Sequence, residues 1–203
     1  MTSARARRIA GNALLVVLFL LFAYANFRRW RETGRPVGFG TTLLGATVAF
    51  LFIVRRPPEQ TSHRVVAWLA APIGTFGMLL ARPVEHPNPG PALALELLQL
   101  VGVIFAFAGL GMLGRSFGLV AANRGVKTSG LYRLVRHPVY AGYFIADCGY
   151  VLENASLRNA ALLALATLGQ LIRISEEERL LAGDAAYRDY RGRVRYRLIP
   201  YLY

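Results

Sequence analysis

Apolar runs about as long as a membrane span are the feature that most restricts how this chain can fold. Four such runs precede residue 115, at 9–27, 37–54, 65–81 and 92–114. A helix needs about 20 predominantly apolar residues to cross the hydrocarbon core of a bilayer. No water reaches that core, so a spanning segment must satisfy its own backbone hydrogen bonds, as a helix does. The runs therefore predict an all-α, polytopic membrane helical bundle rather than a soluble domain.

Two shorter apolar runs follow and complete the predicted bundle. They cover residues 138–152 and 159–174 and are separated by a short polar segment. We expect a helical hairpin here, which either crosses the bilayer by tilting or dips part-way into it. The chain then has about six membrane-embedded helices. No linker is long enough to divide residues 1–203, so we predict a single integral membrane domain.

Loop charges predict how this bundle lies in the membrane. The chain has 24 Lys and Arg against 11 Asp and Glu, and 55% of its residues are hydrophobic. The basic residues cluster at the ends of apolar runs, where they anchor helices and attract anionic headgroups. Membrane lipids, and no nucleic acid, are therefore the expected partners. With the N-terminus inside, the inner segments hold 18 of the 24 basic residues and the outer ones 6. This asymmetry predicts cytoplasmic N- and C-termini in the plasma (inner) membrane, although the outer segment 28–36 opposes it with four arginines.

Several other features are read as structurally neutral. The first apolar run lacks a small-residue cleavage site after it, so we interpret it as a retained helix rather than a signal peptide. The single cysteine, Cys148, permits no internal disulfide, and no cluster of residues has the spacing of a metal site. His63 and His86 lie in turn-rich loops and are expected to be solvated.

The segment between the fourth and fifth runs concentrates chemistry-bearing residues. Residues 124–142 read RGVKTSGLYRLVRHPVYAG, with four cationic side chains, a histidine, two tyrosines and a proline. The residue before a proline is pushed out of the α region and proline fits the first turn of a helix, so a helix should begin near Pro138. Its free N–H groups would face the loop that holds Arg124 and Lys127, which suits a ligand bearing a carboxylate.

The C-terminal segment adds a second polar cluster. Arg173 and Glu177 stand one helical turn apart and share a face, as do Tyr187 and Tyr190. Arg173 ends an apolar run, where an unpaired guanidinium is costly. By contrast, the neighbouring charged residues are expected to pair in solvent on a surface helix. These neighbours are Glu176, Glu178 and Arg179.

Together the two clusters predict one site at the cytoplasmic membrane face. Arg124, Lys127 and His137 offer donors, and Glu177 offers an acceptor. Aromatic surfaces come from Tyr132, Tyr140, Tyr187 and Tyr190. Such a set suits a zwitterionic adenosine cofactor, with cations for its carboxylate, an acid for its amine or ribose, and rings for its adenine or sulfonium.

A family resemblance points the same way. The stretches TSGLYRLVRHPVYAGY, RISEEERLL, YRDYRGRV and RLIP resemble the isoprenylcysteine carboxyl methyltransferase family, integral membrane enzymes that use S-adenosylmethionine. The likeness covers about residues 115–203 and implies that this part is the catalytic region, preceded by four helices in 1–114. The resemblance assigns the cofactor pocket to Arg124, Gly125, Val126, Lys127, Tyr132, His137, Pro138, Val139, Tyr140 and Glu177. It assigns Arg173 to the acceptor substrate. The segment between Glu178 and Tyr187 is shorter than is usual in the family, and the loop 117–124 is compact.

The implied reaction is a direct methyl transfer in which alignment supplies most of the rate. A carboxylate acceptor of isoprenylcysteine type would need no general base, and Arg173 would hold it while a lipophilic tail enters from the bilayer. An amine or thiol acceptor would require Glu177 or a tyrosine to take a proton.

Polar residues inside the apolar runs leave two interpretations open. Asp147 is interpreted either as a substrate contact or as a buried hydrogen-bond acceptor, with neither favoured. Glu96 and Gln99 share one helix face, and an interhelical hydrogen bond is favoured there over a substrate contact.

Three alternatives to carboxyl methylation remain. The first is a phospholipid, amine or small-molecule methyltransferase of the same architecture. The second is a NADPH-dependent membrane sterol reductase, which shares an R-H-P-x-Y motif but is expected to have Asn in place of Val139. The third is a non-catalytic subunit that binds lipid headgroups, against which the pairing of Arg173 with Glu177 argues.

Overall fold

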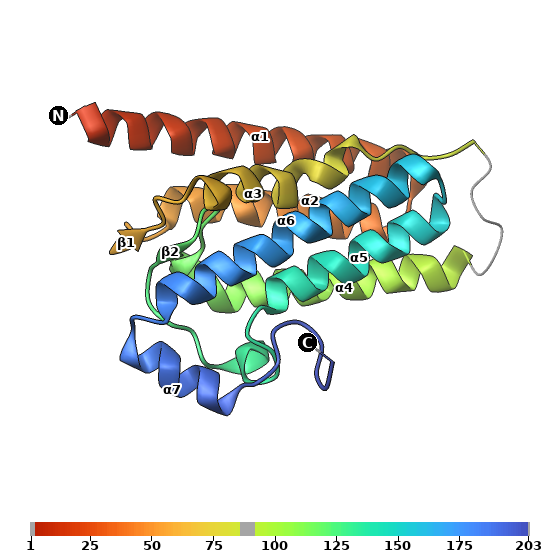
Figure 1. The fold of residues 1–203 in the computed structure, drawn as a ribbon. Coiled ribbons are helices and arrows are strands. Elements are labelled where there is room, and N and C mark those ends of the chain that lie inside the picture. The colour runs from red at the N-terminus through yellow and green to blue at the C-terminus, as the bar shows by residue number, and fades with distance from the viewer. Residues whose placement is uncertain (1–2, 86–91, 203) are drawn as a thin grey trace.

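The computed structural model describes residues 3–85 and 92–202, with side chains described from residue 9 onward. Long helices lie side by side along most of the molecule (Figure 1). The helices are α1 (Ser3–Thr33), α2 (Pro36–Val54), α3 (Val65–Phe76), α4 (Ala92–Leu113), α5 (Pro138–Glu153), α6 (Leu157–Leu181) and α7 (Ala185–Arg193). Three short 3-10 helices are η1 (Gly77–Leu80), η2 (Gly114–Ser116) and η3 (Gly130–Arg133). The two-residue strands β1 (Gln60–Thr61) and β2 (Ala122–Asn123) pair antiparallel. The predicted all-α bundle is confirmed.

Within residues 3–85 and 92–202, four helical stretches are long and apolar enough to cross a membrane, and they indicate an integral membrane protein. They are Ile9–Thr33, Pro36–Val54, Ala92–Ser116 and Leu157–Leu181. The third predicted run forms an apolar stretch of Val65–Leu80, made of α3 with Pro72 inside it and of η1, and it is too short to count among these four. The sixth run is longer than its apolar pattern and continues to Leu181. Its last turns are polar, but ion pairs with other parts of the chain hold them, as described below.

Glycines bring α4 and α5 into close contact and so fix where α5 begins. A Cβ atom on Gly102 would lie 2.3 Å from the backbone nitrogen of Ala146. One on Gly142 would lie 2.4 Å from the backbone nitrogen of Ala106. No larger side chain fits at either position without moving backbone, so the two helices touch along their main chains. This contact holds the first turn of α5 against the rest of the bundle.

The polar residues predicted to join helices do so. The Gln99 side-chain amide donates to a Glu153 carboxylate oxygen over 2.8 Å, which is the interhelical hydrogen bond expected there. Arg35, just before α2, bridges Glu153 at 2.7 Å and Glu96 at 3.4 Å. His63 is exposed as expected, and His86 lies outside the described residues.

The remaining segments gather at one end of the bundle. The strands, η3 and α7 all lie at the end where α6 finishes (Figure 1). The backbone nitrogens of Arg136 and His137 donate to the carbonyl oxygens of Tyr196 and Arg197, each over 2.9 Å. The loop that leads into α5 and the tail that follows α7 therefore lie against each other.

Candidate functional site

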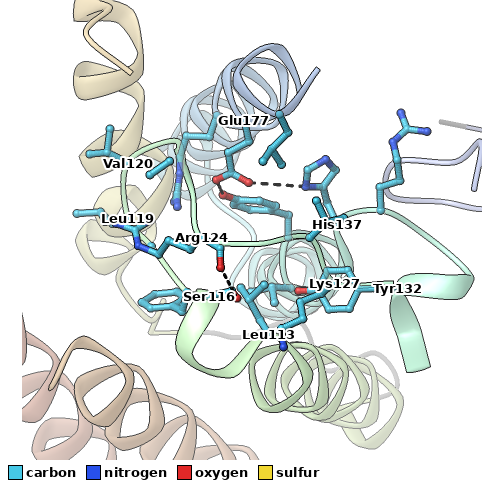
Figure 2. Close-up of a pocket in the computed structure, with 18 of the residues that line it drawn as sticks. Leu113, Ser116, Leu119, Val120, Arg124, Lys127, Tyr132, His137 and Glu177 are labelled. Carbon is cyan, nitrogen blue, oxygen red and sulfur yellow. Dashed lines mark hydrogen bonds and ion pairs between the residues drawn. The ribbon is translucent and has the colours of Figure 1, made fainter. Parts of the chain in front are cut away.

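A cavity opens between these covering segments and the ends of the long helices (Figure 2). Every predicted cofactor residue except Pro138 lines it, and so does Arg173. The predicted residues on its walls are Arg124, Gly125, Val126, Lys127, Tyr132, His137, Val139, Tyr140, Arg173, Glu177, Tyr187 and Tyr190. Pro138 instead begins α5 and is fully buried in the packing. Residues from loop, α5, α6 and α7 thus meet at one place although up to 66 positions separate them in the sequence.

One wall of the cavity was missed by the sequence reasoning. It is lined by Leu113 at the end of α4 and by Ser116, Leu119 and Val120 in the segment that follows α4. The Ser116 hydroxyl donates to the carbonyl oxygen of Arg124 over 3.0 Å, so this segment folds back over the site. These residues are mostly apolar and follow a spanning helix, so the sequence offered no signal that separates them from a helix end.

Glu177 presents a carboxylate to the cavity. The Tyr140 hydroxyl donates to one of its oxygens, and His137 Nδ1 lies 3.8 Å from the other. Both contacts are drawn in Figure 2. The side chain is 22% exposed, so its carboxylate keeps acceptor capacity toward the cavity. A bound amine or hydroxyl can therefore donate to it.

The structure corrects the interpretation of Glu178 and Glu176 as solvent-exposed. Glu178 is 3% exposed and contacts Arg136 Nε at 2.8 Å, His137 Nε2 at 3.1 Å and Arg197 Nη2 at 2.9 Å. Glu176 is also buried and pairs with Arg64 at 2.8 Å. Spacing within α6 could not reveal partners that come from other segments. Because Glu178 holds Nε2 of His137, the ring directs Nδ1 toward Glu177.

Arg173 is buried and has no acidic partner among the residues that the structure describes. Its Nη1 donates to the Thr75 hydroxyl over 2.7 Å, and its guanidinium carbon lies 5.0 Å from the centre of the Tyr140 ring. Its Nε is buried and has no hydrogen-bond partner among the residues that the structure describes. A buried guanidinium with an unused donor favours an anionic or electron-rich ligand beside it.

The cationic side of the cavity comes from the loop before η3. Arg124 is buried, and its Nε donates to the carbonyl oxygen of Arg56 over 3.2 Å. Burial lowers the pKa of the Arg124 guanidinium, and the charge of Glu177 opposes that shift. Gly125 has φ of +92°, in the left-handed region that favours glycine, and so turns the chain between Arg124 and Val126. Lys127 lies half-buried on the same wall.

Tyrosines form the wall near α7. The rings of Tyr187 and Tyr190 have centres 5.9 Å apart, and Tyr132 packs in the same buried cluster. The Tyr190 hydroxyl donates to the carbonyl oxygen of Tyr132 over 2.7 Å. Burial raises the pKa of both α7 tyrosines, so they stay neutral. The Tyr187 hydroxyl is buried and has no partner within the described part of the chain, which leaves a donor for a ligand.

The donor set fits the predicted adenosine cofactor, but the free space is small. Cations, an acid and aromatic rings surround one cavity, as such a ligand needs. The free volume is about 120 Å³, below the roughly 300–1,000 Å³ of typical small-molecule sites. A nucleoside-sized ligand therefore needs this cavity to widen as it binds.

Asp147 does not line this cavity. It lines a second and larger one of about 720 Å³ among the long helices. Thr75 and Tyr143 line both cavities, and Arg173 is bonded to Thr75, so the two spaces adjoin at that arginine. The structure thus places the Asp147 side chain on the wall of this second cavity.

Comparisons with known proteins bear on the family of this chain. Residues 94–183 match the sequence model of the isoprenylcysteine carboxyl methyltransferase (ICMT) family. The chain is also similar to methanethiol S-methyltransferase 2 of Bradyrhizobium diazoefficiens, with 29% identity over 213 residues, which cover 95% of this chain and 75% of that protein. The family resemblance predicted from the motifs is therefore confirmed.

Proposed function

We propose that this protein, a membrane methyltransferase of the isoprenylcysteine carboxyl methyltransferase family, transfers a methyl group from S-adenosylmethionine to a lipophilic acceptor. The observation that carries the proposal is that two incompletely satisfied charged groups, Glu177 and Arg173, lie one turn apart on α6 and line the same cavity. Glu177 faces the first cavity, which also holds the cations and tyrosines. Arg173 lies where that cavity adjoins the second, larger cavity among the long helices (the membrane cavity). A cofactor site thus lies beside an acceptor site.

Different residues of the first cavity contact different parts of the cofactor. Arg124 and Lys127 hold its carboxylate, Glu177 accepts hydrogen bonds from its amine or ribose, and the tyrosines near α7 contact its adenine. When bound, the cofactor supplies an electrophilic methyl group on a sulfonium. His137 and Tyr140 orient Glu177 for this contact, because both lie against its carboxylate.

Arg173 holds the acceptor. A carboxylate of isoprenylcysteine type would pair with the guanidinium, which would hold a carboxylate oxygen toward the methyl group that the cofactor supplies. Positioning supplies most of the rate, and no base is needed. The lipophilic tail extends into the membrane cavity, whose walls are mainly apolar.

A thiol acceptor is the second candidate, supported by the relative named as a methanethiol S-methyltransferase. A thiol must lose its proton to become a strong nucleophile. The Tyr140 hydroxyl, which is hydrogen-bonded to Glu177, offers a route for that proton. A phospholipid amine would make the same demand.

The charge distribution supports an orientation. We place the α7 end of the bundle and both termini on the cytoplasmic side of the plasma (inner) membrane, where the cofactor is made. The inner segments then hold 18 of the 24 basic residues.

The test uses detergent-purified protein and methyl-labelled S-adenosylmethionine. The protein should be stabilised by S-adenosylmethionine and not by NADPH, and label should appear in one member of an acceptor panel. The panel contains S-farnesylcysteine, methanethiol and phosphatidylethanolamine. Stabilisation by NADPH alone would favour a reductase, and binding of neither cofactor would leave the non-catalytic alternative.

A further inference from the structure

One side of α5 carries polar side chains from the cofactor cavity into the membrane cavity. Tyr140, Tyr143, Asp147 and Tyr150 follow one another at intervals of three or four residues, which places them on the same side of the helix. At a rise of 1.5 Å per residue, Asp147 lies about 10 Å along the helix from Tyr140. Tyr140 lines the cofactor cavity, Tyr143 lines both cavities, and the last two line the membrane cavity.

The Asp147 carboxylate has no partner in this arrangement. Tyr140 is bonded to Glu177, and Tyr150 interacts with the Arg29 guanidinium. Across residues 3–85 and 92–202, Asp147 makes no hydrogen bond or ion pair. It therefore has the full acceptor capacity of a carboxylate directed at the cavity.

Three of the other polar side chains on the cavity walls are already used to join helices. Asn26 accepts from the Thr41 hydroxyl over 2.9 Å. Gln99 donates to Glu153, and Gln170 donates to the carbonyl oxygen of Gly74 over 3.3 Å. These side chains have structural roles that explain their presence. Asp147 has no such role.

Much of the remaining wall is apolar, which makes an unpaired acid costly. Leu18, Phe22, Leu44 and Met78 line the same cavity. An ionisable group at membrane depth is unfavourable unless it pairs with another group or lines a functional path. A leucine or alanine would serve packing better at position 147. The carboxylate is therefore explained by a ligand that it binds.

We propose that Asp147 binds a protonated amine on the acceptor, about two helical turns from the atom that is methylated. This inference rests on the proposed function, because Arg173 marks the methylated end. A cationic amine is the expected group because an ionised carboxylate in a weakly polar cavity gains most from an opposite charge. The acceptor class is then a long amphiphile with a nucleophilic group at one position and an amine about 10 Å away.

An amine-bearing acceptor differs from a small thiol in how much of the cavity it fills. Methanethiol would occupy only the space beside Arg173 and would leave Asp147 unpaired and the cavity of about 720 Å³ unfilled. A purely hydrocarbon tail would fill the cavity but leave Asp147 unpaired. An amine-bearing amphiphile satisfies the size of the cavity and its one unpaired acid together.

The experiment compares two probes of equal length, n-dodecylamine and 1-dodecanol, titrated into purified protein that is saturated with S-adenosylmethionine. We expect the amine to bind at least about tenfold more tightly than the alcohol, since a buried ion pair exceeds a neutral hydrogen bond. Asp147→Asn keeps the shape of the side chain and should reduce that preference to less than about twofold. Met78→Leu changes the same cavity without touching charge and should retain it.

The outcomes separate this inference from the proposed function. Equal binding of the two probes to the wild type, or a preference that survives in Asp147→Asn, would overturn the amine site. S-adenosylmethionine affinity is measured on the same samples and should be unchanged in Asp147→Asn. If the wild type binds no S-adenosylmethionine, the methyltransferase proposal fails, whereas the amine preference can still be measured without the cofactor.

Discussion

The charged side chains on the last turns of α6 are fully paired on one face of the helix and incompletely paired on the other. On the face toward the C-terminal tail, Glu178 is buried among Arg136, His137 and Arg197. On the face toward the cavity, Glu177 keeps acceptor capacity and Arg173 has a buried nitrogen without a partner in the described structure. The two glutamates are adjacent in sequence. Saturated charges therefore hold the cover of the site in place, whereas incompletely paired charges remain available to ligands.

The largest expected effect is a loss of stability when the fully paired acid Glu178 is removed. Glu178→Ala leaves two guanidinium groups and a histidine without their acid, and loss of one partner of a buried ion pair costs about 3–5 kcal/mol. The contact between the C-terminal tail and the loop before α5 should weaken, because the ion pair between Arg197 and Glu178 is lost. Thermal unfolding in detergent measures the loss.

Glu176→Ala is the matched control for that experiment. Glu176 is also buried, but its partners Arg64 and Arg179 are more than half exposed. Exposed cations return to solvent when their acid is removed, so the loss should stay near or below about 1 kcal/mol. Equal destabilisation by the two variants would contradict the distinction between the faces of α6.

The second effect concerns turnover. Arg173→Ala should lower kcat by about 100-fold, because a displacement of the acceptor by about 1 Å can slow a reaction by that factor. Cofactor affinity should change by less than about twofold, since the guanidinium binds Thr75 and stacks over Tyr140 rather than holding the cofactor. Labelled methyl transfer and a separate binding titration measure the two quantities.

Arg173→Lys sharpens this result. A lysine keeps the charge but lacks the planar fork, so kcat should fall between those of the wild type and the alanine variant. A large loss of cofactor affinity in either variant would instead assign Arg173 to the cofactor pocket.

The third effect is smaller and lies on the cavity face. Glu177→Ala should raise the Kd for S-adenosylmethionine by roughly 10- to 100-fold, the range for hydrogen bonds to a charged group. Stability should change little, because the side chain is partly exposed and Tyr140 is its only close hydrogen-bond partner in the described residues. Isothermal titration measures the affinity. An unaltered Kd would move the cofactor away from α6.

Local sequence signals predicted the parts of the site that depend on spacing within one element. The proline after His137 gave the start of α5, and the one-turn interval placed Arg173 and Glu177 on one face. These features follow from backbone geometry, which short sequence patterns contain. The site of contact between the loop and the tail followed from the same motifs.

Partners from distant segments were beyond those signals. Glu178 resembled a solvent-exposed residue because its three partners lie at 136, 137 and 197. The length of α6 was underestimated for the same reason, since tertiary ion pairs stabilise a polar helix end that its apolar pattern does not predict. The position of Asp147 on a cavity wall could not be predicted, because sequence spacing does not show where a cavity lies within a helix bundle.

The smallest effects compare two neighbouring tyrosines on α7. The Tyr190 hydroxyl is saturated by the Tyr132 carbonyl, whereas the buried Tyr187 hydroxyl has no partner within the described residues. Tyr190→Phe should therefore destabilise the protein by about 1 kcal/mol, since it removes a hydrogen bond and leaves a buried carbonyl unpaired.

Tyr187→Phe should have the opposite pattern. The free protein should be unchanged or slightly more stable, because an unsatisfied buried hydroxyl is removed. Cofactor affinity should fall about fivefold, the value of one neutral hydrogen bond of roughly 1 kcal/mol. Thermal unfolding with and without S-adenosylmethionine separates the two terms in each variant. If Tyr187→Phe loses stability without the cofactor, its hydroxyl already has a partner in the free protein. The rule drawn from the two faces of α6 would then not extend to α7.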